Sequence, residues 1–231
     1  MKEYQKCAKE MLDFIEKSPT CFHAVANIKE MLKEQGFEEL KETAGWQLAW
    51  GKGYFVTRND SSLIAFKVPG STADRVSIGT DGLRGFHIIA SHSDSPAFKV
   101  KESPEMTVEN TYVKLNTEKY GGMILSTWLD RALSVAGRVV VKGANGVETR
   151  LVNVDKDLLV IPNVAIHMNR DINKGYEYNP QVDLLPLMGL GNKESAKELL
   201  LKTVAESAKV KKEDIVASDL FLYVREKTKI K

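Results

Sequence analysis

A change of hydrophobic pattern after the first third of the chain most constrains its fold. Residues 3–17 and 20–36 place their apolar side chains at helical spacing. The pair Ser18 and Pro19 ends the first of these helices, because the residue before a proline avoids the α region. Thr20 is expected to cap the second. Beyond them the chain consists mainly of short apolar runs separated by turn residues. The sequence therefore predicts two amino-terminal helices followed by strands.

Most of the strand predictions come from short apolar runs bounded by turn residues. The turn pair Asn59 and Asp60 separates the first two runs, and Asn145 and Gly146 between two later runs is a strong hairpin signal. The apolar run at 86–91, bounded by Gly85 and a polar cluster, is expected to be a buried strand. The predicted strands are Tyr54–Thr57, Leu63–Phe66, Phe86–Ser91, Phe98–Lys101, Thr111–Leu115, Gly137–Lys142, Val147–Val154, Leu158–Ile161 and Asp219–Val224.

Three further segments complete the expected organisation. Ser71–Gly85 carries several glycines among polar residues and is expected to be a loop. Met123–Leu133 is expected to be a short helix, and Ser195–Lys209 a longer one. The pair Ser103 and Pro104 marks a change to strand-rich sequence, so we expect a domain boundary there.

Composition excludes several functional classes. The 231-residue chain is 43% hydrophobic and 28% charged, which is typical of a globular protein. Its 33 basic and 31 acidic residues nearly balance, so no nucleic-acid or membrane partner is expected. No apolar run approaches the roughly 18 residues of a membrane span. The two cysteines, Cys7 and Cys21, do not form a disulfide scaffold, which favours a reducing, cytoplasmic location.

The short motifs of common enzyme classes are absent, including HExxH, CxxC, GxSxG and the phosphate-binding loop. Any imidazole chemistry must therefore use one of four histidines. His23 lies in the first turn of a predicted helix and is expected to pack or to form hydrogen bonds. His87 is expected on the opposite strand face from His92, as a histidine of the core or between elements. His167 lies among apolar and amide residues, and it is either at a capped element end or presented to a ligand.

His92 and Asp94 form the most distinctive local pattern. They follow the predicted strand and lie two positions apart, and in extended backbone such residues point to the same face. The carboxyl end of a strand is where open α/β sheets bind ligands, and a carboxylate often orients a metal-bound histidine. A plain polar turn, with Ser93 and Asp94 capping local amides, explains the same spacing. The spacing alone favours this simpler interpretation.

Six segments between residue 3 and about residue 224 share the order and approximate spacing of one set of family motifs. They are Ser18–Val25, Ala90–Pro96, Tyr120–Gly122, Ser126–Arg131, Ala136–Val139 and Ile161–His167. Taken together, they resemble the aspartyl aminopeptidase family of zinc metallopeptidases. Six collinear matches are far more specific than any single one. They favour the metal-binding interpretation of His92.

The resemblance implies an α/β fold, in which a helix-flanked mixed sheet of a phosphorylase/hydrolase-like catalytic domain carries an inserted, mostly β dimerisation domain. On this basis residues 1–103 are the amino-terminal part of the catalytic domain. Residues 104–216 are the inserted domain, and residues 217–231 return as a strand to the catalytic domain. The family also implies a homo-oligomer, a dimer that assembles further into a large shell, up to a dodecamer.

The resemblance further implies hydrolysis of N-terminal peptide bonds by two zinc ions, with a preference for Asp or Glu at the peptide N-terminus. His92 matches the family's first zinc ligand, Asp94 the carboxylate that orients it, and His167 a histidine that contacts the peptide substrate from the neighbouring subunit. The family's remaining metal ligands have no counterpart in this sequence. Because a catalytic zinc typically takes three protein ligands, the 231-residue chain is expected to be a truncated, inactive form.

Two alternatives remain. The missing ligands suggest a non-catalytic assembly or interaction fragment of the same family. A generic α/β binding protein would require the six matches to be accidental. The isolated chain is expected to behave poorly in solution unless dimerisation covers its unpaired sheet edge.

Overall fold

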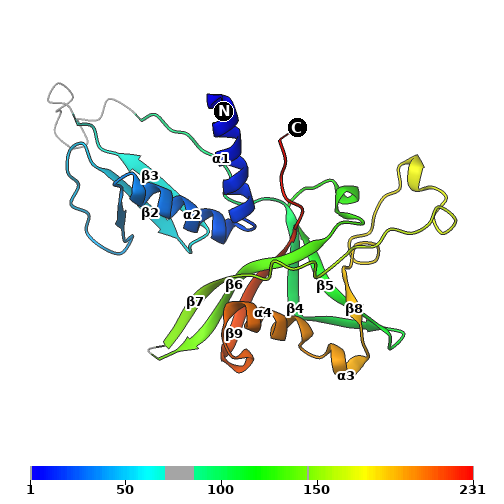
Figure 1. The fold of residues 1–231 in the computed structure, drawn as a ribbon. Helices are drawn as coiled ribbons and strands as arrows, with labels where there is room; N and C mark the ends of the chain where they lie inside the picture. Colours follow the sequence, from blue (N-terminus) through cyan, green and yellow to red (C-terminus); the bar gives the residue numbers. More distant parts are fainter. Residues whose placement is uncertain (1, 71–85, 145, 231) are drawn as a thin grey trace. The chain divides into compact units, whose positions relative to one another are not determined.

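The computed structural model describes residues 2–70, 86–144 and 146–230. The chain divides into two compact units, one of Asp13–Asp94 and one of Met1–Leu12 with Ser95–Lys231, and each is described by itself (Figure 1). Both contain helical and β structure, which confirms the predicted α/β class. The predicted loop at 71–85 lies outside the described residues. No helix within the described ranges is both long enough and apolar enough to cross a membrane.

The two amino-terminal helices lie where the sequence predicts them, with α1 at Glu3–Lys17 and α2 at Cys21–Glu34. Gly36 follows α2 with a φ of 78°, a left-handed conformation that glycine adopts without strain. Thr20 stands at the N-cap position of α2, but its side chain makes no capping bond. The Thr20 hydroxyl instead bonds to Nδ1 of His23 at 2.8 Å. The predicted side-chain cap is therefore wrong.

The unit of Asp13–Asp94 contains a three-stranded sheet in the order β1-β2-β3. Its strands are β1 (Glu38–Leu40), β2 (Gly53–Arg58) and β3 (Ser62–Lys67). β1 is parallel to β2, and β2 is antiparallel to β3. Asn59 and Asp60 form the predicted turn between β2 and β3 with φ values of 52° and 49°. α2 packs on this sheet, and Val25 and Phe55 are fully buried.

The segment Phe86–Ser91 is not a buried strand, and this prediction is wrong. The segment has no regular secondary structure, and Phe86, Ile88 and Ile89 are 77%, 83% and 99% exposed. A buried strand needs neighbours that satisfy its backbone and cover its side chains. No strand among the described residues pairs with this segment. Its apolar composition predicted burial without showing what would cover it.

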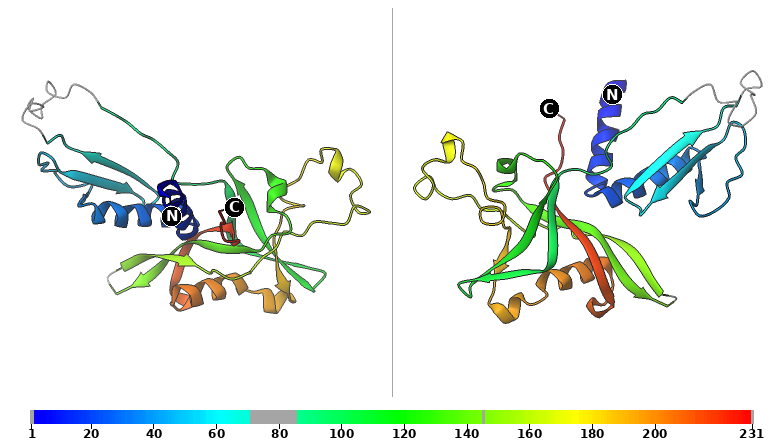
Figure 2. Two further views of the ribbon diagram at one scale, coloured as in Figure 1. Left: turned by 45° about the horizontal axis from the view of Figure 1, so that its top comes forward. Right: turned by 180° about the vertical axis from the view of Figure 1, so that it is seen from behind.

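The second unit is built on a six-stranded antiparallel sheet in the order β7-β6-β9-β4-β5-β8 (Figure 2). Its strands are β4 (Ala97–Val108), β5 (Tyr112–Tyr120), β6 (Leu133–Gly143), β7 (Gly146–Asn153), β8 (Leu187–Leu190) and β9 (Ile215–Val224). β6 and β7 form the predicted hairpin, with Gly143 paired to Gly146. Helix α4 (Leu199–Ala208) packs on β7 and β4. It buries Leu200 and Val204 in the core.

Two helix predictions for this unit need correction. A helix over Met123–Leu133 is replaced by a 3₁₀ helix at Leu125–Trp128, because Leu133 already begins β6. The predicted helix from Ser195 to Lys209 consists of α3 (Lys193–Ala196) and α4. The two are separated at Glu198, whose φ of 55° is left-handed and interrupts a right-handed helix.

Two strand predictions also differ from the structure. Leu158–Ile161 forms isolated bridges, Leu159 to Leu133, Val160 to Leu187 and Ile161 to Leu129, rather than a regular strand. Asp219–Val224 lies in β9, which pairs with β6 and β4. The strand begins at Ile215, four residues earlier than predicted, and lies between β6 and β4 in the six-stranded sheet.

The expected boundary at Ser103 and Pro104 falls inside β4. The register of β4 shifts there between Val100 and Glu105, and Ser103 has a left-handed φ of 48°. The compact units divide between residues 94 and 95. The assignment of 1–103, 104–216 and 217–231 to catalytic and inserted domains stays a prediction.

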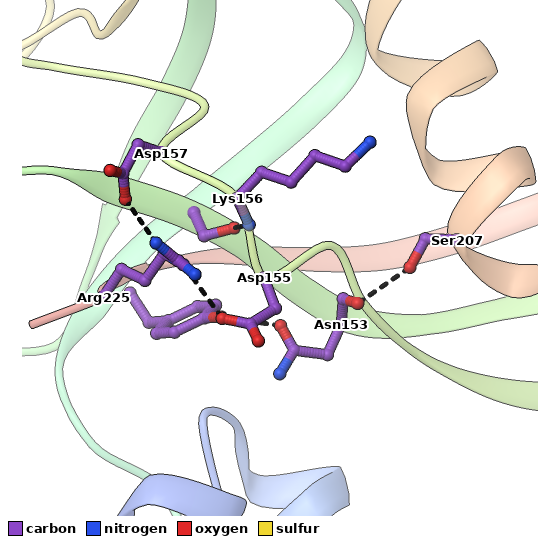
Figure 3. A network of polar contacts seen from close by, with 8 residues as sticks. Asn153, Asp155, Lys156, Asp157, Ser207 and Arg225 are labelled. Atoms are coloured by element: carbon purple, nitrogen blue, oxygen red, sulfur yellow. Dashed lines mark hydrogen bonds and ion pairs between the residues drawn. The ribbon is translucent and has the colours of Figure 1, made fainter. Parts of the chain in front are cut away.

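A polar network holds the segment that follows β7 (Figure 3). Arg225, just after β9, donates from Nε to Asp155 Oδ1 at 2.9 Å and from Nη1 to Asp157 Oδ1 at 2.7 Å. The carbonyl oxygen of Asn153 accepts a hydrogen bond from Ser207 of α4 at 2.7 Å. Together with the hydrogen bond from the N–H of Val154 to the carbonyl oxygen of Val135 at 3.0 Å, these contacts fix the turn after β7 to α4, to β6 and to the end of β9.

Candidate active-site residues

His92 and Asp94 meet as their spacing predicts. His92 Nδ1 lies 3.0 Å from Asp94 Oδ1, and the two side chains are 88% and 37% exposed. When the proton is on Nδ1, the ring donates this hydrogen bond to the carboxylate and keeps a lone pair on Nε2. This is the arrangement of a metal-binding histidine that a carboxylate orients.

Ser93 anchors the backbone between these two residues. Its hydroxyl donates to the carbonyl oxygen of Ser61 at 2.8 Å, and Ser61 directly precedes β3. The residues on either side of Ser93 have no regular secondary structure. The His92–Asp94 pair is thus attached to the small sheet by a side-chain contact rather than by strand pairing.

The donor set fits one position of a metal centre. The described residues contain no group of three or more His, Cys, Asp or Glu side chains that could hold a metal ion. A catalytic zinc typically uses three protein ligands and a water molecule. Nε2 of His92 fits one such ligand position, and Asp94 fits as its orienting group.

His167 lies in the other compact unit, on the segment between Ile161 and β8 that extends away from the sheet (Figures 1 and 2). His167 is exposed. So are the flanking apolar residues Val164, Ile166 and Met168, at 56%, 46% and 80%. The segment therefore presents the imidazole among uncovered apolar side chains. Because His92 and His167 belong to different units, their joint role stays a prediction.

Asp130 holds the base of the His167 segment, and the sequence pattern did not single it out. Its Oδ1 accepts a hydrogen bond from the backbone N–H of Asn163 at 2.8 Å. Its own N–H donates to the carbonyl oxygen of Ile161 at 2.9 Å. The side chain of Asn163 accepts from the N–H of Val164 at 2.9 Å, so this amide serves local structure. No sequence signal connects Asp130 with Asn163, because 33 residues separate them.

The two other histidines are placed differently from each other. His23 is partly buried and bonds to Thr20, as expected of a packing residue. Burial lowers the pKa of His23 from 6.5 to about 4, so its ring is neutral at pH 7. His87 is exposed, so of its two predicted places the one in the core is wrong. The prediction failed because the segment that carries His87 is not a strand.

A cavity of about 1030 Å³ lies in the six-stranded unit, between the bulge of β4, α3, the start of α4 and β9. Lysine and glutamate side chains line much of it, among them Lys101, Glu102, Lys197 and Glu198. None of the three predicted site residues lines this cavity. It is therefore separate from the candidate active-site residues.

Comparison with known sequences identifies relatives along the whole chain. A family model described as aminopeptidase I zinc metalloprotease (M18) matches residues 14–231. A probable M18 family aminopeptidase 2 of Clostridium novyi is 51% identical over 233 residues, which cover 100% of this chain and 52% of the relative. An aspartyl aminopeptidase of Dictyostelium discoideum is 43% identical over 191 residues, 81% of this chain and 37% of the relative. The chain thus spans about half the length, or less, of these relatives.

Solved structures show the same relationship. The structure of an Ape4 and Nbr1 complex matches with a TM-score of 0.88 and 35% identity, and covers 98% of this chain and 45% of the matched one. The S. cerevisiae mApe1 dodecamer matches with a TM-score of 0.76 and 25% identity, over 98% of this chain and 50% of that one. The family match covers nearly every residue of both compact units. The chain belongs to the aminopeptidase I zinc metalloprotease (M18) family.

Proposed function

We propose that this chain is part of a zinc aminopeptidase that removes N-terminal residues, with a preference for Asp and Glu, from peptides. The observation that carries the proposal is the His92–Asp94 pair, an exposed imidazole oriented by a carboxylate in a chain of a zinc metalloprotease family. The relative named aspartyl aminopeptidase supports the preference for acidic residues.

Three side chains have distinct roles in this proposal. His92 holds one of two zinc ions through Nε2, and Asp94 keeps the ring in the tautomer that frees this nitrogen. When bound, zinc supplies Lewis-acid polarisation of the scissile carbonyl and activation of water. His167 contacts the peptide from a neighbouring subunit, which agrees with its exposure on the segment between Ile161 and β8. The described residues contain no group of three or more side chains that could bind a metal ion, so the other zinc ligands come from elsewhere in the assembled enzyme.

A homo-oligomer is part of the proposal. Val164, Ile166 and Met168 expose apolar surface around His167, and uncovered apolar groups of this kind favour protein contacts. The structural relative mApe1 is a dodecamer. We expect a second copy of the chain to cover this segment. A cytoplasmic location agrees with Cys7 and Cys21, neither of which forms a disulfide within the described residues.

The test is His92→Ala in the full-length protein, with bound zinc and the hydrolysis rate of acidic aminoacyl substrates as readouts. Both should fall strongly. Asp94→Asn should weaken zinc binding or activity by about 10- to 100-fold, as expected for an orienting group. His87→Ala is the matched control, because it changes an exposed histidine five positions earlier and should alter neither readout. Unchanged zinc and turnover in His92→Ala would refute the proposal.

A non-catalytic assembly role for the 231-residue chain by itself is favoured by its donor set. One metal-binding position among the described residues does not support turnover, whereas the apolar segment around His167 supports association. The purified 231-residue chain should form oligomers in light scattering, bind no stoichiometric zinc and leave acidic aminoacyl substrates intact. Robust hydrolysis by this chain would eliminate the assembly role.

A further inference from the structure

We infer that Asp130 is a positioning residue, which fixes the direction in which the segment carrying His167 leaves the six-stranded sheet. The inference deepens the proposed function and rests on it, since His167 is taken to contact substrate. Asp130 itself is not assigned any contact with substrate. It acts through the backbone at residues 161–163.

The contacts at the start of the segment are of two kinds. On one side, Leu129 and Ile161 form a parallel bridge, and Ile161 is fully buried in the hydrophobic core. The second kind is the pair of hydrogen bonds that Asp130 makes with the chain as it leaves the sheet. Its N–H donates to the carbonyl oxygen of Ile161 at 2.9 Å, and its Oδ1 accepts from the N–H of Asn163 at 2.8 Å. Asp130 therefore binds the backbone on both sides of Pro162, where the segment that carries His167 leaves the core.

The backbone at Asp130 supports a specific role. Its φ of 57° is left-handed, a conformation that is strained for most residues and is tolerated best by glycine, asparagine and aspartate. Such a conformation persists where surrounding contacts determine it. Here the left-handed conformation directs both the N–H and the carboxylate of Asp130 to residues 161–163, where the chain leaves the sheet.

The residues next to Asp130 are themselves fixed. Arg131 forms an ion pair with Glu226 at 2.9 Å, and the carbonyl oxygen of Ala132 accepts from the N–H of Arg225 at 3.1 Å. Both partners follow β9, in the centre of the sheet. Asp130 is thus held by the sheet on one side and holds the His167 segment on the other.

The Asp130–Asn163 contact affects the position of His167, because only three residues separate Asn163 from His167. A hydrogen bond from the N–H of Met168 to the carbonyl oxygen of Ala165 at 2.8 Å closes a turn around His167, so a change of direction at Asn163 moves this turn and its imidazole relative to the sheet. A misplacement of about 1 Å can cost about 10²-fold in rate when a group must meet bound substrate. Loss of the carboxylate contact should therefore lower kcat/KM without removing any group that touches substrate.

Two substitutions separate the carboxylate from the backbone effect. Asp130→Gly adopts the left-handed conformation freely but has no acceptor for Asn163. Asp130→Asn keeps an acceptor oxygen and also tolerates that conformation. Both are made in the full-length enzyme, alongside His167→Ala and the double variant Asp130→Gly with His167→Ala. The readouts are amide hydrogen exchange over residues 162–168 and steady-state kinetics with an acidic aminoacyl substrate.

We expect Asp130→Gly to accelerate exchange at Asn163 and the following amides and to lower kcat/KM by about 10- to 100-fold. Asp130→Asn should resemble the parent enzyme in both readouts. The double variant should be no slower than His167→Ala, because two residues that act through one group are not additive. Unchanged exchange in Asp130→Gly, or additive losses in the double variant, would overturn the inference.

The same set distinguishes this inference from the proposed function. If His167→Ala leaves kcat/KM unchanged while Asp130→Gly accelerates exchange, the catalytic role of His167 fails and the positioning of the segment by Asp130 holds. If His167→Ala reduces kcat/KM and Asp130→Gly changes neither readout, the role of His167 holds and the positioning role of Asp130 fails.

Discussion

Replacement of Gly137 by alanine is expected to disrupt the centre of the six-stranded sheet. Gly137 lies in β6 and pairs with Leu220 of β9. A Cβ atom on Gly137 would overlap the carbonyl oxygen of Asp219 and lie 3.0 Å from Cα of Leu220. Both obstacles are backbone atoms of the neighbouring strand, so rotation of a side chain cannot relieve the overlap. The two strands would have to separate.

The size of the effect follows from what that separation breaks. Overpacking of a well-packed site costs typically about 1–3 kcal/mol, and each ladder hydrogen bond that is stretched loses about 0.5–1.5 kcal/mol. The flanking residues Val135 and Val139 are fully buried, so separation also loosens the core beneath β6. Together these terms predict a loss of about 3 kcal/mol or more in the free energy of unfolding. For a unit of this size the melting temperature should fall by roughly 6–12 °C.

The matched control is Gly189→Ala in β8. A Cβ atom on Gly189 meets nothing within 4 Å, so its effect should stay within about 0.5 kcal/mol. Thermal and urea denaturation followed by circular dichroism measure both variants. A melting temperature for Gly137→Ala equal to that of Gly189→Ala would show that β6 and β9 do not approach as described.

Further substitutions test the partly buried His23 and the start of α4. Because burial lowers the pKa of His23 to about 4, the unfolded chain binds a proton between about pH 6.5 and pH 4 that the folded chain does not. The free energy of unfolding should therefore fall as the pH drops through this window, by up to about 3 kcal/mol. His23→Asn should remove that part of the decline in urea denaturation, and an unchanged pH dependence would contradict the assignment. Glu105 accepts a hydrogen bond from the N–H of Leu200 in the first turn of α4 at 2.9 Å, so Glu105→Ala should destabilise the protein by about 1 kcal/mol. Glu105→Gln keeps the acceptor and should cost less, and equal losses in the two variants would argue against a capping role.

The elements that the sequence predicts well are those whose signals are local. Helices α1 and α2 follow from apolar spacing together with the stop at Ser18 and Pro19 and the glycine at position 36. The β2–β3 turn follows from Asn59 and Asp60. Each of these signals is complete within a few residues, so no knowledge of the rest of the fold is needed to interpret it.

The failures share a different cause. Residues 86–91 have the composition of a central strand but no partner among the described residues. The break between α3 and α4 at Glu198 does not appear in the apolar spacing, which continues through it. The neighbours of β9 likewise depend on the whole sheet. Pattern and propensity describe one segment at a time, whereas these features are decided by contacts between segments.

The candidate site divides in the same way. The His92–Asp94 contact was predictable because extended backbone places residues two positions apart on one side. The contact between Asp130 and Asn163 was not, because it joins segments 33 residues apart through a backbone N–H. Side chains that accept from main-chain groups leave no pattern in a sequence, even when they determine where a functional histidine points.

The exposure of residues 86–91 and the incomplete set of metal ligands at His92 can be explained together. Ile88 and Ile89 are largely uncovered, and His92 is a metal ligand candidate without companions among the described residues. A ring that is 88% exposed and held by one neighbouring carboxylate is not rigid enough to define a metal centre by itself. In the proposed full-length enzyme, pairing of this segment with further strands would cover the isoleucines and bring other strand ends, with their ligands, beside His92. The exposure of the apolar run and the incomplete donor set would then have one cause. Compared with the 231-residue chain, the full-length enzyme should therefore bind zinc more tightly at His92 and protect the amides of residues 88 and 89 more strongly from hydrogen exchange.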